Sequence, residues 1–279
     1  MITGAGGMLG RVLTRQARRQ GYETMALSSS QCDITDYRAI RAHVGPDEVV
    51  INCAAYTNVD GAETDSDRAF AVNAEGAGNL ARVCAETGAQ LVHVSSDYVF
   101  SGRRRDPYET DEPTGPVNVY GRSKLAGEHE VLTALPRAVV VRSAWVYTGS
   151  PNSTDFVATM RRKANSRSKV LAVDDQIGSP TYAADLADAL LSVAAGASGP
   201  GLVLHAVNAG AVSRFEQARA VFEILGADPQ LVQPVPAANY PRAAWRPAFS
   251  ALSTQRSEVA GLAPLRPWRD ALADALHAS

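Results

Sequence analysis

Short apolar runs alternate with amphipathic stretches over the first two-thirds of the chain. Three runs of strand length are apolar on both faces, at 49–55, 90–96 and 138–147. Between them, apolar residues recur at helical spacing over 10–21, 67–88 and 123–135, and Gly21 and Gly88 stand where helix C-caps belong. A further strand is expected over 23–30. These repeated strand–helix–strand units predict an α/β fold with a doubly wound parallel sheet, the Rossmann arrangement.

The pattern changes after about residue 150. Three amphipathic helices are expected over 153–164, 181–196 and 214–227, and prolines become frequent from Pro229 onward. We therefore expect two domains: 1–150, which also receives part of 165–195, and a smaller α/β domain over 151–279. A cleft between two such domains is a common place for ligands.

Composition and charge exclude several classes of protein. The net charge of −2 over 279 residues indicates neither a nucleic-acid partner nor an anionic membrane. No apolar run approaches 18 residues, and the N-terminus does not have the pattern of a signal peptide. The three cysteines show no metal-ligand spacing and are expected to be free thiols. A cytoplasmic protein without a metal centre is the expectation.

Glycines dominate the first ten residues. Gly4, Gly7 and Gly10 lead directly into the first predicted helix. Glycines at this spacing allow a tight turn and a close approach of the backbone to a pyrophosphate, which the helix N-terminus then binds. The domain over 1–150 is therefore predicted to bind a nicotinamide dinucleotide.

The strand that should precede this glycine loop is nearly absent. Only Met1 and Ile2 stand before Thr3, whereas strands usually have about five residues. We expect that the natural start lies upstream or that the chain is a shortened form. An added apolar, β-branched run should then stabilise the protein.

Residues after the second predicted strand bear on the choice of cofactor. An acidic residue there would favour NAD, but Ser28 and two further serines follow instead. Hydroxyl groups tolerate a 2′-phosphate, although no arginine stands directly at this position, so NADPH is favoured and NADH stays possible. Asp33 could accept a hydrogen bond from adenine, whereas Asp36 better suits a helix N-cap.

Tyr120 and Lys124 are four residues apart at the start of a predicted helix, so their side chains share one face. A nearby ammonium group lowers the pKa of a phenol, which lets the pair exchange a proton with a carbonyl or an alcohol. Such a spacing is common by chance. The preceding nucleotide-binding pattern and the hydroxyl-rich segment 95–102 favour an acid–base role for the Tyr120–Lys124 pair over a chance occurrence.

Nine segments together resemble the extended short-chain dehydrogenase/reductases and, within them, the dTDP-4-dehydrorhamnose reductase family: "TGAGGMLG", "CDITD", "NCAAYTNVDGAE", "AVNAEGAGNLA", "VSSDYVFSG", "VYGRSKLAGE", "VRSAWVY", "DDQIGSPTYAADLA" and "RPAFSALS". The resemblance covers nearly the whole chain. It implies an NADPH-dependent oxidoreductase that reduces the 4-keto group of dTDP-4-dehydro-L-rhamnose, the last step of dTDP-rhamnose biosynthesis in bacteria. The product serves cell-surface polysaccharides.

The resemblance also implies roles for individual residues. Tyr120 would donate a proton to the C4 oxygen, Lys124 would bind the nicotinamide ribose, and Ser96 would hydrogen-bond the keto oxygen. The expected cofactor-binding residues are Gly4, Gly7, Met8, Leu9, Gly10, Ser28, Asp33, Ile34, Ala55, Tyr56 and Thr57, together with Tyr120 and Lys124. The expected substrate-binding residues are Ser96, Asp97, Tyr98, Trp145, Asp60 and Arg246, the last as a diphosphate partner.

One departure from the family bears on assembly. Some members dimerise through Mg²⁺ held by a glutamate just after the third glycine, and Val12 stands at that position here. A monomer is therefore expected rather than a metal-bridged dimer.

Two alternative functions stay open. One is another nucleotide-sugar reductase or epimerase of the same superfamily. The other is a non-catalytic regulatory subunit that resembles the reductase, although such a protein need not keep Ser96, Tyr120 and Lys124.

Overall fold

Six parallel strands form the largest sheet of the computed structural model, which describes residues 1–196 and 201–278. The strand order is β10-β5-β4-β3-β1-β2. The strands are β1 (Ile2–Thr3), β2 (Ala26–Leu27), β3 (Val49–Asn52), β4 (Gln90–Ser96), β5 (Val139–Ser143) and β10 (Leu202–His205). Although β1 has only two residues, it pairs with β2 on one side and β3 on the other.

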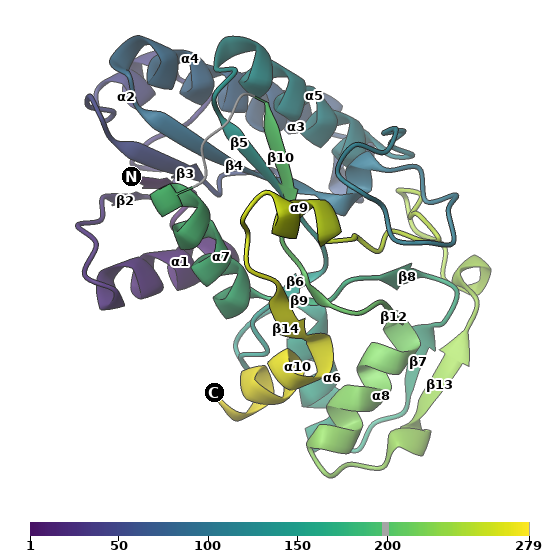
Figure 1. Ribbon diagram of the computed structural model, residues 1–279. Helices are drawn as coiled ribbons and strands as arrows, with labels where there is room; N and C mark the ends of the chain where they lie inside the picture. The colour runs from purple at the N-terminus through teal and green to yellow at the C-terminus, as the bar shows by residue number, and fades with distance from the viewer. Residues whose placement is uncertain (197–200, 279) are drawn as a thin grey trace.

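Helices cover both faces of this sheet, as Figure 1 shows. On one face lie α1 (Met8–Arg19) and α7 (Ala183–Gly196), which pack on Ile51 and Val141. On the other lie α2 (Tyr37–Arg41), α4 (Ala77–Thr87) and α5 (Val119–Ala134), which pack on Val50 and Val140. Successive strand residues therefore enter opposite cores, which explains why the strands are apolar on both faces. The predicted doubly wound fold is confirmed.

The helix expected over 67–88 is wrong as a single continuous element. It divides into α3 (Ser66–Phe70), a π-helical turn (Ala71–Gly76) and α4, which ends at Gly88 in the left-handed conformation (φ 83°). π-Helical turns often occur at functional sites. Here the turn carries Asn73, which contacts the segment after β3.

Two strand predictions also need correction. The run 138–147 forms β5 and the separate β6 (Val146–Tyr147), because Trp145 between them has a positive φ of 46°. The expected strand over 23–30 is reduced to the two residues of β2.

A second lobe contains short strand pairs and the helices α6, α8 and α10, in the lower part of Figure 1. Its core joins α6, α8 and α10 to the parallel pair β7–β13. These helices are α6 (Phe156–Asn165), α8 (Arg214–Ile224) and α10 (Trp268–His277), whereas α9 (Gln255–Val259) lies against β10, where His205 N donates to Ser257 Oγ. The strands are β7 (Val170–Val173), β8 (Ile177–Gly178), β9 (Thr181–Tyr182), β11 (Asn208–Ala209), β12 (Val212–Ser213), β13 (Val232–Val235) and β14 (Leu265–Pro267). The described residues also form 3₁₀ turns at Gly61–Glu63, Asp97–Val99, Pro229–Leu231 and Ala237–Asn239.

The chain returns to the sheet lobe after entering the second one. α7 packs against α1, and β10 extends the sheet beside β5. We therefore propose that the sheet lobe comprises residues 1–147, 183–196 and 201–206, which is in line with the expected 1–150 joined by part of 165–195. Within the described ranges, no helix is long and apolar enough to cross a membrane.

Candidate active site

Tyr120 and Lys124 lie on the first two turns of α5. The side chain of Asn118 caps this helix by accepting a hydrogen bond of 2.7 Å from Gly121 N. The cap fixes the start of the helix at Val119. It therefore also fixes the place of Tyr120 in the first turn.

Two glycines let α5 approach its neighbours closely. A Cβ atom at Gly121 would lie 2.2 Å from the carbonyl oxygen of Tyr98, and one at Gly127 would lie 2.0 Å from that of Asn73. No side chain fits at these distances. The glycines of "YGRSKLAG" therefore seat the Tyr120 helix against the end of β4 and the π-helical turn.

Ser96, the last residue of β4, places its hydroxyl beside the Tyr120 phenol at the carboxyl end of this strand. Ser96 Oγ also donates to Asp97 Oδ1 over 3.1 Å and accepts from Tyr98 N over 3.2 Å. Burial raises the pKa of Tyr120, and the neighbouring Ser96 hydroxyl opposes that effect. Tyr120 therefore carries its proton at neutral pH and is ready to donate it.

Lys124 is 2% exposed, and its Nζ donates a 2.7 Å hydrogen bond to the carbonyl oxygen of Val94 in β4. Burial lowers the pKa of Lys124 to about 8. Burial is the main cause of the raised pKa of Tyr120, and the expected effect of Lys124 on that pKa stays a prediction.

Candidate substrate residues gather around the Tyr120 phenol. The ring of Tyr98 meets that of Tyr120 edge-on, with centroids 5.7 Å apart. Arg246 forms a bidentate ion pair with Asp60. Asp97 is buried, and burial raises its pKa to about 6. The second lobe is thus joined to the sheet lobe at this point.

Trp145 enters the cleft from the turn between β5 and β6. A Cβ atom at Gly178 would lie 2.4 Å from Cε2 of the indole. The glycine of "QIGSPT" therefore leaves the space that the Trp145 ring occupies. The same ring lines a cavity of about 480 Å³, together with Met8, Thr57 and Arg214.

The glycine loop before α1 has the shape that a pyrophosphate needs. Gly4 has a φ of 64°, and a Cβ there would lie 2.5 Å from Ala54 N, while one at Gly10 would lie 2.3 Å from Gly4 O. Gly6 and Gly7 are exposed. The first intrahelical bond runs from Arg11 N to Gly7 O, so the N–H groups of Met8 and Leu9 point out of the helix end. These residues fit a dinucleotide pyrophosphate.

Asn73 is a positioning residue to which the sequence pattern did not point. Its Oδ1 accepts from Tyr56 N over 2.8 Å, and its Nδ2 donates to Tyr56 O and to Ser123 Oγ. It therefore holds the segment Ala55–Tyr56–Thr57 against α5. The π-helical turn, which the sequence pattern did not predict, directs the Asn73 side chain toward Tyr56 and Ser123.

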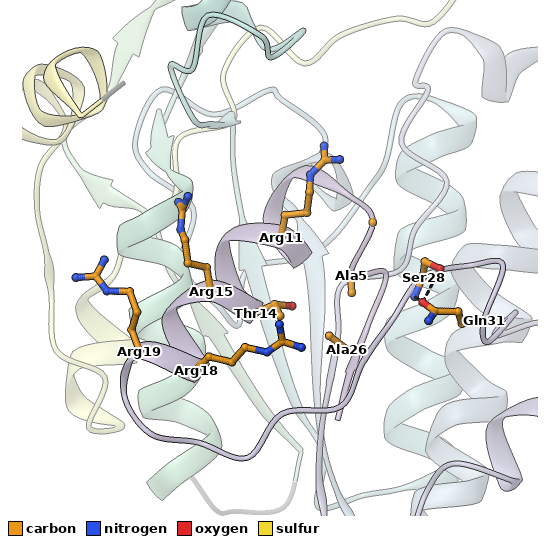
Figure 2. Close-up of a pocket in the computed structure, with 10 residues that line it drawn as sticks. Ala5, Arg11, Thr14, Arg15, Arg18, Arg19, Ala26, Ser28 and Gln31 are labelled. Carbon is orange, nitrogen blue, oxygen red and sulfur yellow. Dashed lines mark hydrogen bonds between the residues drawn. The ribbon is translucent and has the colours of Figure 1, made fainter.

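The adenosine side of the predicted cofactor site is a groove of about 630 Å³ between α1 and the end of β2. Figure 2 shows its lining, in which Ser28 is hydrogen-bonded to Gln31. The sequence placed no arginine beside Ser28, but the fold brings four to this groove from α1: Arg11, Arg15, Arg18 and Arg19.

The "CDITD" segment adjoins this region. Asp33 Oδ1 accepts hydrogen bonds of 2.9 Å from the backbone and hydroxyl of Thr35, and Ile34 is buried beneath Gly76. Asp36 caps α2, as expected. The exposed Asp33 has a second carboxylate oxygen for which no hydrogen bond is found within the described residues.

No cluster of three or more His, Cys, Asp or Glu side chains suited to a metal ion occurs among the described residues. Val12, at the position where some family members carry a metal-binding glutamate, is buried in the core between α1 and the sheet. Its side chain therefore faces the protein interior.

The sequence is similar to reductases of actinobacteria over its full length. It is 58% identical to a dTDP-4-dehydrorhamnose reductase of Mycolicibacterium smegmatis, covering 100% of this chain and 85% of that protein. It is also 58% identical to the Mycobacterium tuberculosis protein of the same name, covering 100% and 92%.

Solved structures have the same fold. The crystal structure of dTDP-4-dehydrorhamnose reductase from Bacillus anthracis in complex with NADP superposes with a TM-score of 0.91, at 33% identity, over 100% of this chain and 98% of that one. The sequence model described as "RmlD substrate binding domain" matches residues 1–279. The chain belongs to that family, within the fold of the extended short-chain dehydrogenase/reductases.

Proposed function

We propose that this protein reduces the 4-keto group of dTDP-4-dehydro-L-rhamnose with NADPH and so produces dTDP-L-rhamnose. The observation that carries the proposal is that the Ser96 hydroxyl, the Tyr120 phenol and the buried Lys124 lie together at the carboxyl end of β4. The 58% identity to reductases of this name supports the choice of substrate.

Each residue has a defined task in this reaction. When bound, reduced nicotinamide supplies the hydride. Tyr120 gives its proton to the C4 oxygen, and the Ser96 hydroxyl donates a hydrogen bond to the same oxygen as charge develops there. Lys124 binds the ribose hydroxyls and restores the proton of Tyr120. The glycine loop and Asn73, through the segment Ala55–Thr57, orient the dinucleotide.

The groove beside Ser28 supports NADPH over NADH. No carboxylate stands there to repel a 2′-phosphate. Arg11, Arg15 and Arg18 share one face of α1 at spacings of four and three, and none forms an ion pair within the described part of the chain. Titration calorimetry should therefore give a lower Kd for NADPH than for NADH. Arg18→Gln should reduce that preference, and Arg38→Gln on α2 is a matched control.

Turnover is tested by NADPH oxidation at 340 nm with freshly made dTDP-4-dehydro-L-rhamnose, beside the GDP- and UDP-linked 4-keto sugars. Fast turnover with the dTDP substrate alone is expected. Turnover with another 4-keto sugar would favour a different reductase of the superfamily. No turnover, in a protein that still binds NADPH, would favour a non-catalytic subunit.

We further propose that the enzyme acts as a monomer in the cytoplasm. The buried position of Val12 supports the absence of a metal bridge at α1. Light scattering should give one molar mass near 29.5 kDa with and without Mg²⁺. A doubled mass that EDTA removes would contradict the monomer.

A further inference from the structure

Arg214 lies where the second lobe faces the glycine loop. It is the first residue of α8, directly after the N-cap Ser213. Its guanidinium carbon is 3.5 Å from the ring centroid of Trp145 and 4.9 Å from that of Phe156. Two aromatic faces thus hold the guanidinium group in the wall of the 480 Å³ cavity. Figure 1 shows α8 among the elements of the second lobe.

The charge of Arg214 has no carboxylate partner within ion-pair distance among the described residues. Its Nη1 donates to Gln217 Oε1 over 3.2 Å, which is a neutral acceptor. Burial lowers the pKa of Arg214 to about 10, and the nearby Asp97 opposes that effect only in part. Arg246 differs, because Asp60 already neutralises it. A desolvated cation without a partner is costly, so Arg214 is the cleft arginine best suited to an anionic ligand.

Gln217 provides a second donor at the same place. It is 1% exposed and lines the same cavity. Because Gln217 Oε1 accepts from Arg214, its Nε2 is the remaining donor, and no hydrogen-bond partner is found for it in the described part of the protein. Buried donors normally have an acceptor. The cavity therefore presents a cation and an unsatisfied amide side by side.

We propose that Arg214 and Gln217 bind the diphosphate of the nucleotide-sugar substrate. This inference rests on the proposed function. A diphosphate carries only acceptor oxygens and matches the planar fork of an arginine. Arg214 also stacks on Trp145, one of the candidate sugar-binding residues, so a diphosphate here would be continuous with a sugar near Tyr120.

The pyrophosphate of the cofactor is the competing occupant, since Met8 and Arg11 line the same cavity. The substrate is favoured for two reasons. Arg214 and Gln217 both come from α8 in the second lobe, and the glycine loop with the start of α1 already supplies N–H groups for the cofactor.

Titration calorimetry on the full-length protein tests the assignment with dTDP, thymidine and NADPH as separate probes. Arg214→Gln should weaken dTDP binding by roughly 10- to 100-fold, with thymidine and NADPH affinities unchanged. Gln217→Leu should weaken dTDP binding by a smaller factor. Arg219→Gln, on the same helix but half-exposed and paired with Glu223, should change none of the three.

Unchanged dTDP affinity in Arg214→Gln would overturn the inference, and so would a loss confined to NADPH, which would assign the site to the cofactor. Equal losses for dTDP and thymidine would also overturn it, because the effect would not depend on phosphate. Turnover by the unmodified protein separates the two proposals. If Arg214→Gln weakens dTDP binding but the unmodified protein reduces no sugar, the diphosphate site is supported and the proposed reaction is contradicted.

Discussion

The ammonium nitrogen of Lys124 donates a 2.7 Å hydrogen bond to the carbonyl oxygen of Val94, which ties a buried cation on α5 to the central strand β4. Burial lowers the pKa of this lysine from 10.5 to about 8. Between pH 8 and pH 10.5, Lys124 is protonated in the unfolded chain but largely deprotonated in the folded one. The free energy of unfolding therefore increases as the pH rises through this range.

The substitution Lys124→Met removes this contribution. From pH 7.5 to pH 10, the ligand-free wild type should gain on the order of 3 kcal/mol in unfolding free energy relative to the variant. Urea denaturation at both pH values measures the difference. Lys169→Met, at an exposed lysine, should show no such gain. Parallel pH dependence of wild type and Lys124→Met would contradict the depressed pKa.

Removing the Tyr120 hydroxyl should stop proton donation while the ring stays in place. Tyr120→Phe is expected to lower kcat by about 10²- to 10⁴-fold, the usual contribution of a general acid. The Kd for NADPH should change little, because the hydroxyl that is lost lies against Ser96. Tyr37→Phe, at a tyrosine on α2 that is bonded to Glu86, serves as the control. Near-wild-type turnover in Tyr120→Phe would exclude its role as the acid.

The central strands and the glycine motif could be predicted from local pattern, whereas the extents of β2 and β5 could not. Strand β4 over Gln90–Ser96 and the start of α5 at Val119 match the expectation, because apolar runs and the Asn118 cap are local signals. The π-helical turn that interrupts the helix at Asn73 and the interruption between β5 and β6 at Trp145 could not be predicted. Each depends on a tertiary contact, with Gly127 packed on the first and Gly178 on the second.

The candidate site also contains some residues that the sequence could predict and others that it could not. Tyr120, Lys124 and Ser96 were recognisable from spacing and resemblance, and the fold brings Ser96 and Tyr120 into contact. Arg214 and the α1 arginines carry no local signature, because an arginine on an amphipathic helix resembles any solvated one. Their relation to the cleft and the groove depends on the packing of the elements around them.

Gly178 should control the position of the Trp145 ring. In Gly178→Ala the new methyl group would lie 2.4 Å from the indole, which must therefore move. We expect kcat/KM for the nucleotide sugar to fall by roughly 10- to 100-fold, as for a small misplacement in a site. Near-UV circular dichroism and steady-state kinetics measure the two effects. Gly196→Ala at the end of α7, where no atom of the described residues lies within 4 Å of the added Cβ, is the matched control. An unchanged kcat/KM would show that Trp145 does not position the substrate.

The amino-terminal end of β1 opens on a cavity of about 440 Å³ between β2 and β3. Its lining includes Tyr22, Met25, Val49 and Leu191, and Met1 donates its amine to the Val49 carbonyl oxygen over 2.7 Å. An added Ile-Val-Val segment would continue β1 between its two neighbours. Burying these side chains should add about 1–3 kcal/mol and raise Tm by several degrees in differential scanning calorimetry.

A polar extension of equal length, Ser-Asp-Ser, separates strand pairing from side-chain burial. It offers the same backbone hydrogen bonds to β2 and β3 but places polar groups against Leu191 and Val49. Its Tm should therefore stay near that of the unextended chain or fall below it. Equal Tm values for the apolar extension and the unextended chain would show that the short β1 costs the sheet no stability.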